Sequence, residues 1–417
     1  MLTLFIAIIF CVSWSNAQAK IPIYPLTNFS NGGTARYFSD PYHVPYHKSK
    51  EVYISGTTHK YLECDDFLQP GCASSLENKY ISNHHLNQTA KHSGTTICGA
   101  AGIHPFQRTK DGKRSWDAIV TLHVQDNNNC SGISGWSVIV HAHPEHDTKV
   151  DSPPKSWIGD QVLVGSFAKN VPANYDGKYF QTPDGELYLV YQKQHSKKPK
   201  RDGVFAWRLD NPTTKKAGSK PIMLLLPDKH LNSENYVGSP HFKLIETGNI
   251  RAIAGKFVMA YSVGAYNHPT YKMGIAYSDT FLPTNGKPYR KVMKDNPHNL
   301  WKSKGPKEVY YLLQSEVQHD GWRYVGDQVL APGVPTVAQI GPNGGWVATF
   351  AGFDPGDAPL KKGTDKFVGS HRRPYFVELD VKVPKNVSVK DASDGELQGW
   401  ITPVHKKVGT EANHIEL

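Results

Sequence analysis

The stretch KYFQTPDGELYLVYQ, residues 178–192, contains the pattern that decides the fold. A strand-forming segment, a polar Asp-Gly turn and a second segment rich in Tyr, Leu and Val follow one another, as in a β-hairpin. Similar hairpins recur at residues 42–57, 117–143, 241–262 and 336–352. Their second strands align as EVYISG, GWSVIVH, GELYLVY, GKFVMAY and GGWVATF.

This recurrence predicts a radial repeat. Helical periodicity is scarce, and 36 Gly and 29 Pro divide the 417 residues into short segments, which indicates an all-β protein. A propeller blade takes roughly 40–50 residues, so five blades and their insertions fit the chain. We predict an all-β, five-bladed β-propeller. A β-sandwich with unrelated hairpins is the alternative.

The N-terminus begins with the apolar run LTLFIAIIFCVSW, followed by Ala17-Gln18-Ala19. The run is short for a bilayer span, and A-x-A is a typical signal-peptidase pattern. We therefore expect a signal peptide at residues 1–19, one propeller domain at 20–405 and a flexible tail at 406–417. The mature protein would be secreted and would not associate with a membrane. A membrane anchor is the alternative for the apolar run.

Four cysteines follow the expected cleavage site: Cys64, Cys72, Cys98 and Cys130. An even number in a secreted chain predicts two disulfides. Three pairings are possible. We expect Cys64–Cys72 with Cys98–Cys130, because this pairing closes the most local loops. Sequons that could carry surface glycans begin at Asn28, Asn87, Asn129 and Asn386.

The formal net charge of +10 favours anionic partners such as acidic polysaccharides. No nucleic-acid-binding motif is present in the sequence, so we expect no nucleic-acid partner. We expect a monomer that binds carbohydrate.

The ends of the innermost strands of a propeller line an axial funnel, so residues that precede each first strand are expected to converge. Asp40 and Asp176 occupy nearly the same position relative to Tyr53 and Tyr188 of the second strands. Glycosidic bond hydrolysis needs one ionised carboxylate to activate water and one protonated carboxyl to donate to the leaving oxygen. A third carboxylate can tune the pKa of its neighbour.

Four segments resemble glycoside hydrolase family 43: FSDPYHVPYHKSKEVYISGT (38–57), ANYDGKYFQTPDGELYLVYQ (173–192), residues 238–278 and SHRRPYFVELDV (370–381). The resemblance implies a five-bladed propeller that hydrolyses arabinosides, xylosides or galactosides with inversion. Asp40 would be the general base. Asp176 would modulate the pKa of the acid, with Gly177 in place of the usual proline.

Two short motifs depart from the family pattern. Gly238-Ser239-Pro240 occupies the place of the E-G-P motif that carries the general acid in the family, so we expect Glu234, or another carboxyl that the sequence does not place, to supply the acid. Ala331-Pro332-Gly333-Val334 replaces a G-P-G-H step whose histidine helps to hold a central metal ion or water. We expect no metal and no cofactor. A carbohydrate-binding propeller that lacks the acid is the alternative function.

Further residues are expected to contact the substrate. An indole such as that of Trp116 stacks well on the apolar face of a sugar. Asp117 would be a displaced carboxylate, and Arg372 or Arg373 matches an arginine that reaches the substrate in the family. The expected substrate-binding residues are Trp116, Asp117, His241, Tyr266, Arg372 and Arg373.

Overall fold

Strands are the main regular structure of the described residues. The computed structural model describes residues 21–26, 38–45, 52–56, 60–64, 68, 71–72, 77–78, 80–126, 130, 136–146, 150–168, 172–197, 200–237, 239–294, 308–315, 329–340, 344–355 and 358–405. The expected signal peptide and flexible tail lie outside them. Within these ranges, no helix has the length and apolar character needed to cross a bilayer.

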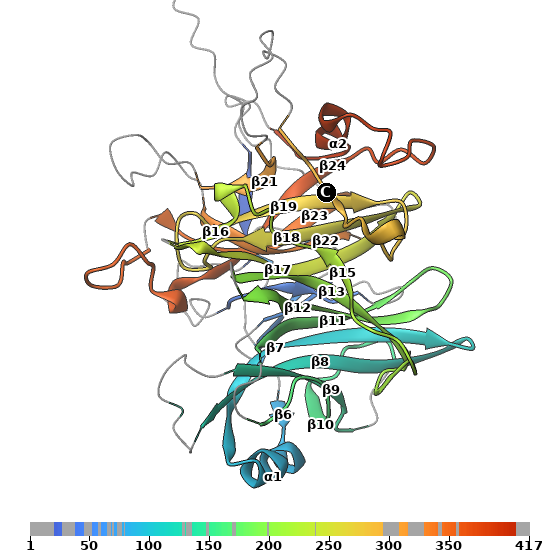
Figure 1. Ribbon diagram of the computed structural model, residues 1–417, viewed down its shortest axis with the longest axis vertical. Helices are drawn as coiled ribbons and strands as arrows, with labels where there is room; N and C mark the ends of the chain where they lie inside the picture. Colours follow the sequence, from blue (N-terminus) through green and yellow to red (C-terminus); the bar gives the residue numbers. More distant parts are fainter. Residues whose placement is uncertain are drawn as a thin grey trace, which may run out of the picture.

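The strands group into five blades, of which the third and fourth are joined into one sheet by a short parallel pairing of residues 200–202 with residues 242–244. Figure 1 shows the strands of blades 2 to 5. Blade 1 contains β2 (Tyr42–His43), β3 (Val52–Ser55), β4 (Lys60–Cys64) and β5 (Glu77–Asn78). Blade 2 contains β7 (Thr95–Lys110), β8 (Lys113–Asp126), β9 (Trp136–Pro144), β10 (Ser156–Val164) and β6 (Tyr80–Ser82). Blade 3 contains β11 (Asn174–Gln181), β12 (Leu187–Lys197), β13 (Lys200–Asn211), β14 (Thr214–Lys215) and β15 (Ile222–Leu225).

The chain continues through two more blades. Blade 4 contains β16 (Asn235–Tyr236), β17 (Ser239–Ile253), β18 (Lys256–Val263), β19 (Lys272–Ser278), β20 (Arg290–Lys291) and β21 (Tyr311–Gln314). Blade 5 contains β22 (Leu330–Gln339), β23 (Trp346–Phe353), β24 (Arg373–Val381), β25 (Ile401–Pro403) and β1 (Ile23–Pro25). Short helices are α1 (His84–His92), α2 (Asp394–Trp400), η3 (Asn232–Glu234), η4 (Thr284–Gly286) and η6 (Gly369–His371).

The interfaces between neighbouring blades are apolar cores, because each blade is apolar on both of its faces. Buried residues join blades 1 and 2 (Tyr53 with Val120), 2 and 3 (Ile139 with Leu189), 3 and 4 (Val204 with Met259), 4 and 5 (Val258 with Phe350), and 5 and 1 (Phe376 with Ile54). The last interface returns to the first blade, so the described strands contact one another in cyclic order. The predicted five-bladed β-propeller is confirmed.

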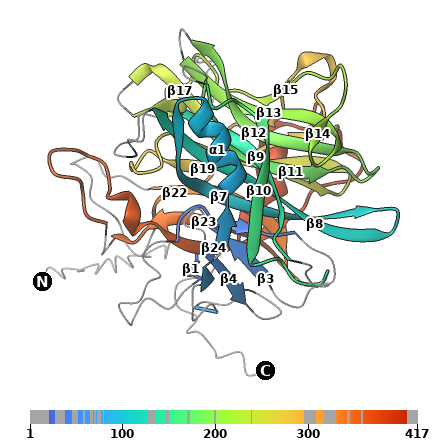
Figure 2. The same ribbon diagram turned by 90° about the horizontal axis from the view of Figure 1, so that it is seen from below.

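The N-terminal strand completes the last blade. β1 pairs antiparallel with β24, with Tyr24 opposite Phe376. Figure 2 shows the blue strands β1, β3 and β4 beside the orange and red strands β23 and β24. Both ends of the described chain are therefore tied into one sheet, which couples the closure of the ring to the folding of blade 5.

The hairpin at 117–143 was expected to begin blade 2, but the structure places β7 before it. His104 of β7 packs edge-on against Tyr42 of β2, and its Nδ1 lies 2.7 Å from the carbonyl oxygen of Gly177 on β11. β7 is therefore the innermost strand of blade 2, and β8 and β9 are its second and third strands. The small residues Cys98–Gly102 hide this strand from an apolar pattern search.

In four of the blades, a residue in or just before the inner strand has a left-handed backbone conformation. Asp40, Asp176, Thr247 and Val334 have positive φ values of 53°, 53°, 58° and 58°. Pro or Gly follows each of them: Pro41, Gly177, Gly248 and Pro335. In β11, β17 and β22 the pairing register shifts at this point, as in a β-bulge. A bulge bends the strand and changes the direction of a side chain, so these positions are turned out of the regular alternation.

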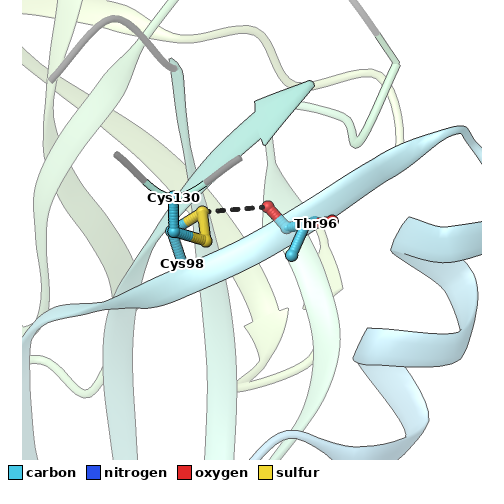
Figure 3. The surroundings of a disulfide bond; sticks show 3 residues. All are labelled: Thr96, Cys98 and Cys130. Carbon is cyan, nitrogen blue, oxygen red and sulfur yellow. Dashed lines mark hydrogen bonds between the residues drawn. A yellow bond between two sulfur atoms is a disulfide. The ribbon is translucent and has the colours of Figure 1, made fainter. Parts of the chain in front are cut away.

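Both expected disulfides are present. Cys64 pairs with Cys72, and Cys98 pairs with Cys130. Figure 3 shows the second bond, which ties β7 to the chain beyond β8; the carbonyl oxygen of Thr96 lies 3.8 Å from the Cys98 sulfur. The pairing that closes the most local loops is therefore the one adopted.

Removing the disulfide that closes the larger loop should lower the free energy of unfolding more than removing the other disulfide. Chain-entropy arithmetic for sequence separations of 32 and 8 gives about 4 kcal/mol for Cys98–Cys130 and about 2.5 kcal/mol for Cys64–Cys72. We expect the Cys98→Ser/Cys130→Ser variant to melt at a lower temperature than the Cys64→Ser/Cys72→Ser variant, and both below the oxidised wild type. The reverse order in thermal unfolding would contradict this prediction.

Candidate active site

Three carboxylates from three blades interact at the inner strands. Asp40 lies two residues before β2, Asp176 lies in the bulge of β11, and Glu246 immediately precedes the bulge of β17. The charge of Asp40 raises the pKa of both other groups, and Asp176 raises that of Glu246. All three side chains are partly accessible. They form one electrostatic cluster, which we call the axial carboxylate cluster.

Glu246 titrates far above the usual range of a carboxyl group. Burial raises its pKa to about 8, and the negative charge of Asp176 adds to the shift. Tyr271 is fully buried, and its hydroxyl donates a hydrogen bond to Glu246 Oε1 at 2.5 Å. At neutral pH most of the Glu246 carboxyl is therefore protonated and held in a fixed orientation, as a proton donor requires.

Asp176 is balanced between opposing influences. Burial raises its pKa, the ammonium of Lys178 lowers it, and Asp40 raises it again. The backbone amide of Thr247 also lowers the pKa of this carboxyl. Gly177 stands beside it because a Cβ there would lie 2.7 Å from the side chains of Ile119 and Ile139. The proline that the family pattern carries at this position would meet the same obstruction.

Arg372 is the cationic partner of Asp40. Its Nη1 donates to Asp40 Oδ1 at 2.5 Å, and only 2% of the side chain is exposed. The guanidinium lies 5.6 Å from the ring centroids of both Tyr266 and Tyr271. Tyr266 is 39% exposed. A buried cation thus compensates one carboxylate, while an accessible aromatic ring lies beside the same group.

Glu234, which we expected to supply the acid, lies in a different setting. Its carboxylate is fully buried in η3 and accepts hydrogen bonds from Lys291 Nζ and from the backbone N–H of Asp228, each at 2.5 Å. A carboxylate held by two donors has no free proton to give. Gly238, where the sequence resemblance placed the acid position, lies outside the described residues.

Trp116 and Asp117 belong to the body of blade 2, because β8 is its second strand. The Trp116 side chain is buried, and Nε1 donates to the carbonyl oxygen of Val150 at 3.0 Å. Asp117 contacts His141 at 3.1 Å and Arg108 at 3.3 Å. The contacts of both residues are therefore with groups outside the axial carboxylate cluster.

The remaining expected residues divide between two settings. Tyr266 and Arg372 adjoin the cluster, as described above. Arg373 instead donates to Asp354 at 3.2 Å. His241 is an exposed residue of β17, on the N-terminal side of Glu246 in the same strand.

The position of Glu246 follows from the β17 bulge. We aligned the acid position with Gly238 because Pro240-His241 matched the family pattern. The sequence does contain a signal: Glu246-Thr247-Gly248 interrupts the apolar strand, and Thr247-Gly248 repeats the left-handed residue and glycine of Asp176-Gly177. The carboxylate of Glu246, directly before this pair of residues, is the signal that the sequence analysis overlooked.

Potential metal ligands lie elsewhere. Val334 lies where the sequence resemblance placed the family's histidine, and its backbone N–H donates to Ser262 Oγ at 2.7 Å. Among the described residues, His141, His143 and Asp160 of blade 2 form a group with ligand atoms within 4.8 Å of one another.

The buried Glu234–Lys291 pair predicts a measurable structural cost. Lys291→Met leaves the Glu234 charge without its main partner, and breaking such a pair costs about 3 kcal/mol or more. Lys294→Met is the matched control, because Lys294 and Glu308 form an exposed pair at 2.7 Å whose loss should cost less than about 1 kcal/mol. Equal losses in urea unfolding would contradict a structural role for Glu234.

The comparisons with known proteins concern the fold. No protein-family model matches the chain, and no curated protein is significantly similar to it. Among solved structures, it is similar to a thermostable family-43 glycoside hydrolase (TM-score 0.53, 15% identity, 90% of this chain and 95% of that one). An α-L-arabinofuranosidase from Lactobacillus brevis gives a TM-score of 0.56 at 14% identity over 85% and 98% of the chains. An exo-1,5-α-L-arabinanase from a bovine ruminal metagenomic library gives a TM-score of 0.52 at 13% identity, over 89% of this chain and 99% of that one. The chain has the fold of the family-43 glycoside hydrolases.

Proposed function

We propose that the protein is a secreted glycoside hydrolase that cleaves O-glycosidic bonds of cell-wall polysaccharides or oligosaccharides with inversion. Asp40 is the general base, Glu246 the general acid, and Asp176 the residue that orients the acid and tunes its pKa. The observation that carries the proposal is that Asp40, Asp176 and Glu246 come together from three inner strands, with the Glu246 carboxyl hydrogen-bonded to the Tyr271 hydroxyl. This assignment replaces Glu234 as the acid.

The reaction is a single displacement. The Asp40 carboxylate accepts a proton from water while the water oxygen attacks the anomeric carbon. Glu246 donates its proton to the departing glycosidic oxygen, so the base ends protonated and the acid ionised. Burial supplies the neutral form of Glu246, and the Tyr271 hydroxyl orients its carboxyl.

The arrangement around the carboxylates fits a sugar ligand. Arg372 fixes Asp40 from the buried side, and the partly exposed ring of Tyr266 offers an apolar face next to it. The similar solved structures include an arabinofuranosidase and an arabinanase. We therefore propose arabinosides as the first substrates to test, with xylosides and galactosides as the other members of the class.

Substitution of the two principal carboxyls should have different effects. We expect Asp40→Asn to lower kcat/KM on the order of 10²–10⁴-fold with every substrate, because base assistance to water is lost. Glu246→Gln should cause a similar loss with arabinan and a much smaller loss with an aryl arabinoside, whose leaving group depends less on a proton donor.

The control is Glu234→Gln, which removes a buried carboxylate outside the cluster. We expect it to lower stability without this dependence on the leaving group. A kcat/KM for arabinan that is the same in Glu246→Gln as in the wild type would contradict the assignment. Sugar binding without turnover by the wild type on any of the three substrate classes would instead favour the carbohydrate-binding propeller.

The pH profile gives a second test. Glu246 must be protonated to act, so kcat/KM should fall as the pH rises through about 8, the pKa of its carboxyl. Asp176→Asn removes a neighbouring negative charge, lowers that pKa and moves the alkaline limb to lower pH. An alkaline limb that stays in place or moves upward in Asp176→Asn would contradict the electrostatic role of Asp176.

A further inference from the structure

A cluster of histidines and carboxylates lies on blade 2, outside the axial carboxylate cluster. His141 and His143 are alternate residues of β9 and therefore face the same side of the sheet. Asp160 faces them from the adjacent strand β10. We propose that His141, His143 and Asp160 bind a zinc ion that ties β9 to β10, with Asp117 orienting His141.

The distances from the Asp160 carboxylate to the two imidazoles are close to those of a metal site, and the ligand atoms of all three residues lie within 4.8 Å of one another. His141 Nδ1 lies 2.7 Å from Asp160 Oδ1, and His143 Nδ1 lies 2.8 Å from Asp160 Oδ2. Two protein ligands of one tetrahedral zinc ion lie ~3.3 Å apart, since zinc–nitrogen and zinc–oxygen bonds are about 2.0–2.2 Å. An outward movement of roughly half an ångström, small for the partly exposed Asp160 and His143, would admit the ion.

The backbone of β10 aims the carboxylate at the histidines. The pairing of β10 with β9 shifts register between Gly159 and Gln161, so Asp160 is the extra residue of a bulge. In a regular strand its side chain would follow the alternation of its neighbours; the bulge breaks that alternation. The third ligand is therefore set by the fold and not by a flexible loop.

Asp117 provides the support that metal-binding histidines usually have. Its Oδ1 lies 3.1 Å from His141 Nε2, and its Oδ2 accepts a hydrogen bond from Arg108 at 3.3 Å. When Nε2 carries the proton and donates it to Asp117, Nδ1 is left with a lone pair that points to Asp160 and the ion. A carboxylate–histidine–metal chain of this kind fixes the tautomer and the ring orientation of a ligand.

The burial of the cluster suits an ion that enters from solvent. His141 is only 5% exposed, whereas His143 and Asp160 are 44% and 34% exposed. One ligand is thus fixed inside the blade, and the other two are accessible. Two imidazoles and one carboxylate favour zinc over calcium or magnesium, which prefer oxygen ligands.

The test is a zinc titration of the full mature chain, produced without a histidine tag and freed of metal by a chelator. We expect the wild type to take up one equivalent of Zn²⁺ at this site and to melt at a higher temperature with zinc. His143→Ala and Asp160→Asn should lose that equivalent and the thermal shift. Asp117→Asn should keep the stoichiometry but bind 10–100-fold more weakly, as expected for a supporting carboxylate.

The matched control is His146→Ala. His146 lies just after β9, its side chain is 79% exposed, and it is outside the cluster. It should bind zinc as the wild type does. Since His143 is partly exposed, its variant is expected to fold, which circular dichroism checks. No zinc uptake by the wild type, or uptake unchanged in both His143→Ala and Asp160→Asn, would overturn the proposal.

Discussion

The site depends on one backbone constraint, the left-handed residue that recurs in the inner strands. Asp40, Asp176, Thr247 and Val334 adopt this conformation although none is glycine. Such residues cost about 1–3 kcal/mol each and persist only where the surrounding structure fixes them. Here the fixing elements are the apolar cores between the blades and hydrogen bonds such as that between Thr247 Oγ1 and Ser262 Oγ at 2.9 Å. The stability of the ring is thus what allows carboxylates to meet at its axis.

The three carboxylates differ in the charged and polar groups that surround them. Arg372 pairs with Asp40, and Lys178 offsets the charge of Asp176. Glu246 has no cation as a direct partner in the described contacts; it receives a hydrogen bond from Tyr271 and stays largely neutral. Groups of one chemical type are pushed to different pKa values by their surroundings, which is how acid and base roles arise in one site. The proposed mechanism needs this difference more than it needs any single distance.

The same structural device serves both proposed sites. At the axis, bulges in β11 and β17 accompany Asp176 and Glu246; in blade 2, a bulge in β10 redirects Asp160 toward two histidines. Asp117 illustrates why the strand assignment matters. Taken as a residue at the start of an inner strand, it would be a ligand of the substrate. As a residue of the second strand, it supports His141 instead.

The sequence by itself favoured an all-β chain of five blades over a sandwich and favoured the most local of three possible disulfide pairings, because hairpin spacing, turn residues and short loops are local properties. It also singled out Asp40, Asp176 and Arg372 as candidates. Only the tertiary structure decided that β7 precedes the hairpin of blade 2, that Lys291 neutralises Glu234 and that Glu246 adjoins Asp176. These facts depend on strand register and on contacts between distant segments. A shift of one residue in a bulge redirects a side chain while leaving the composition of the segment unchanged.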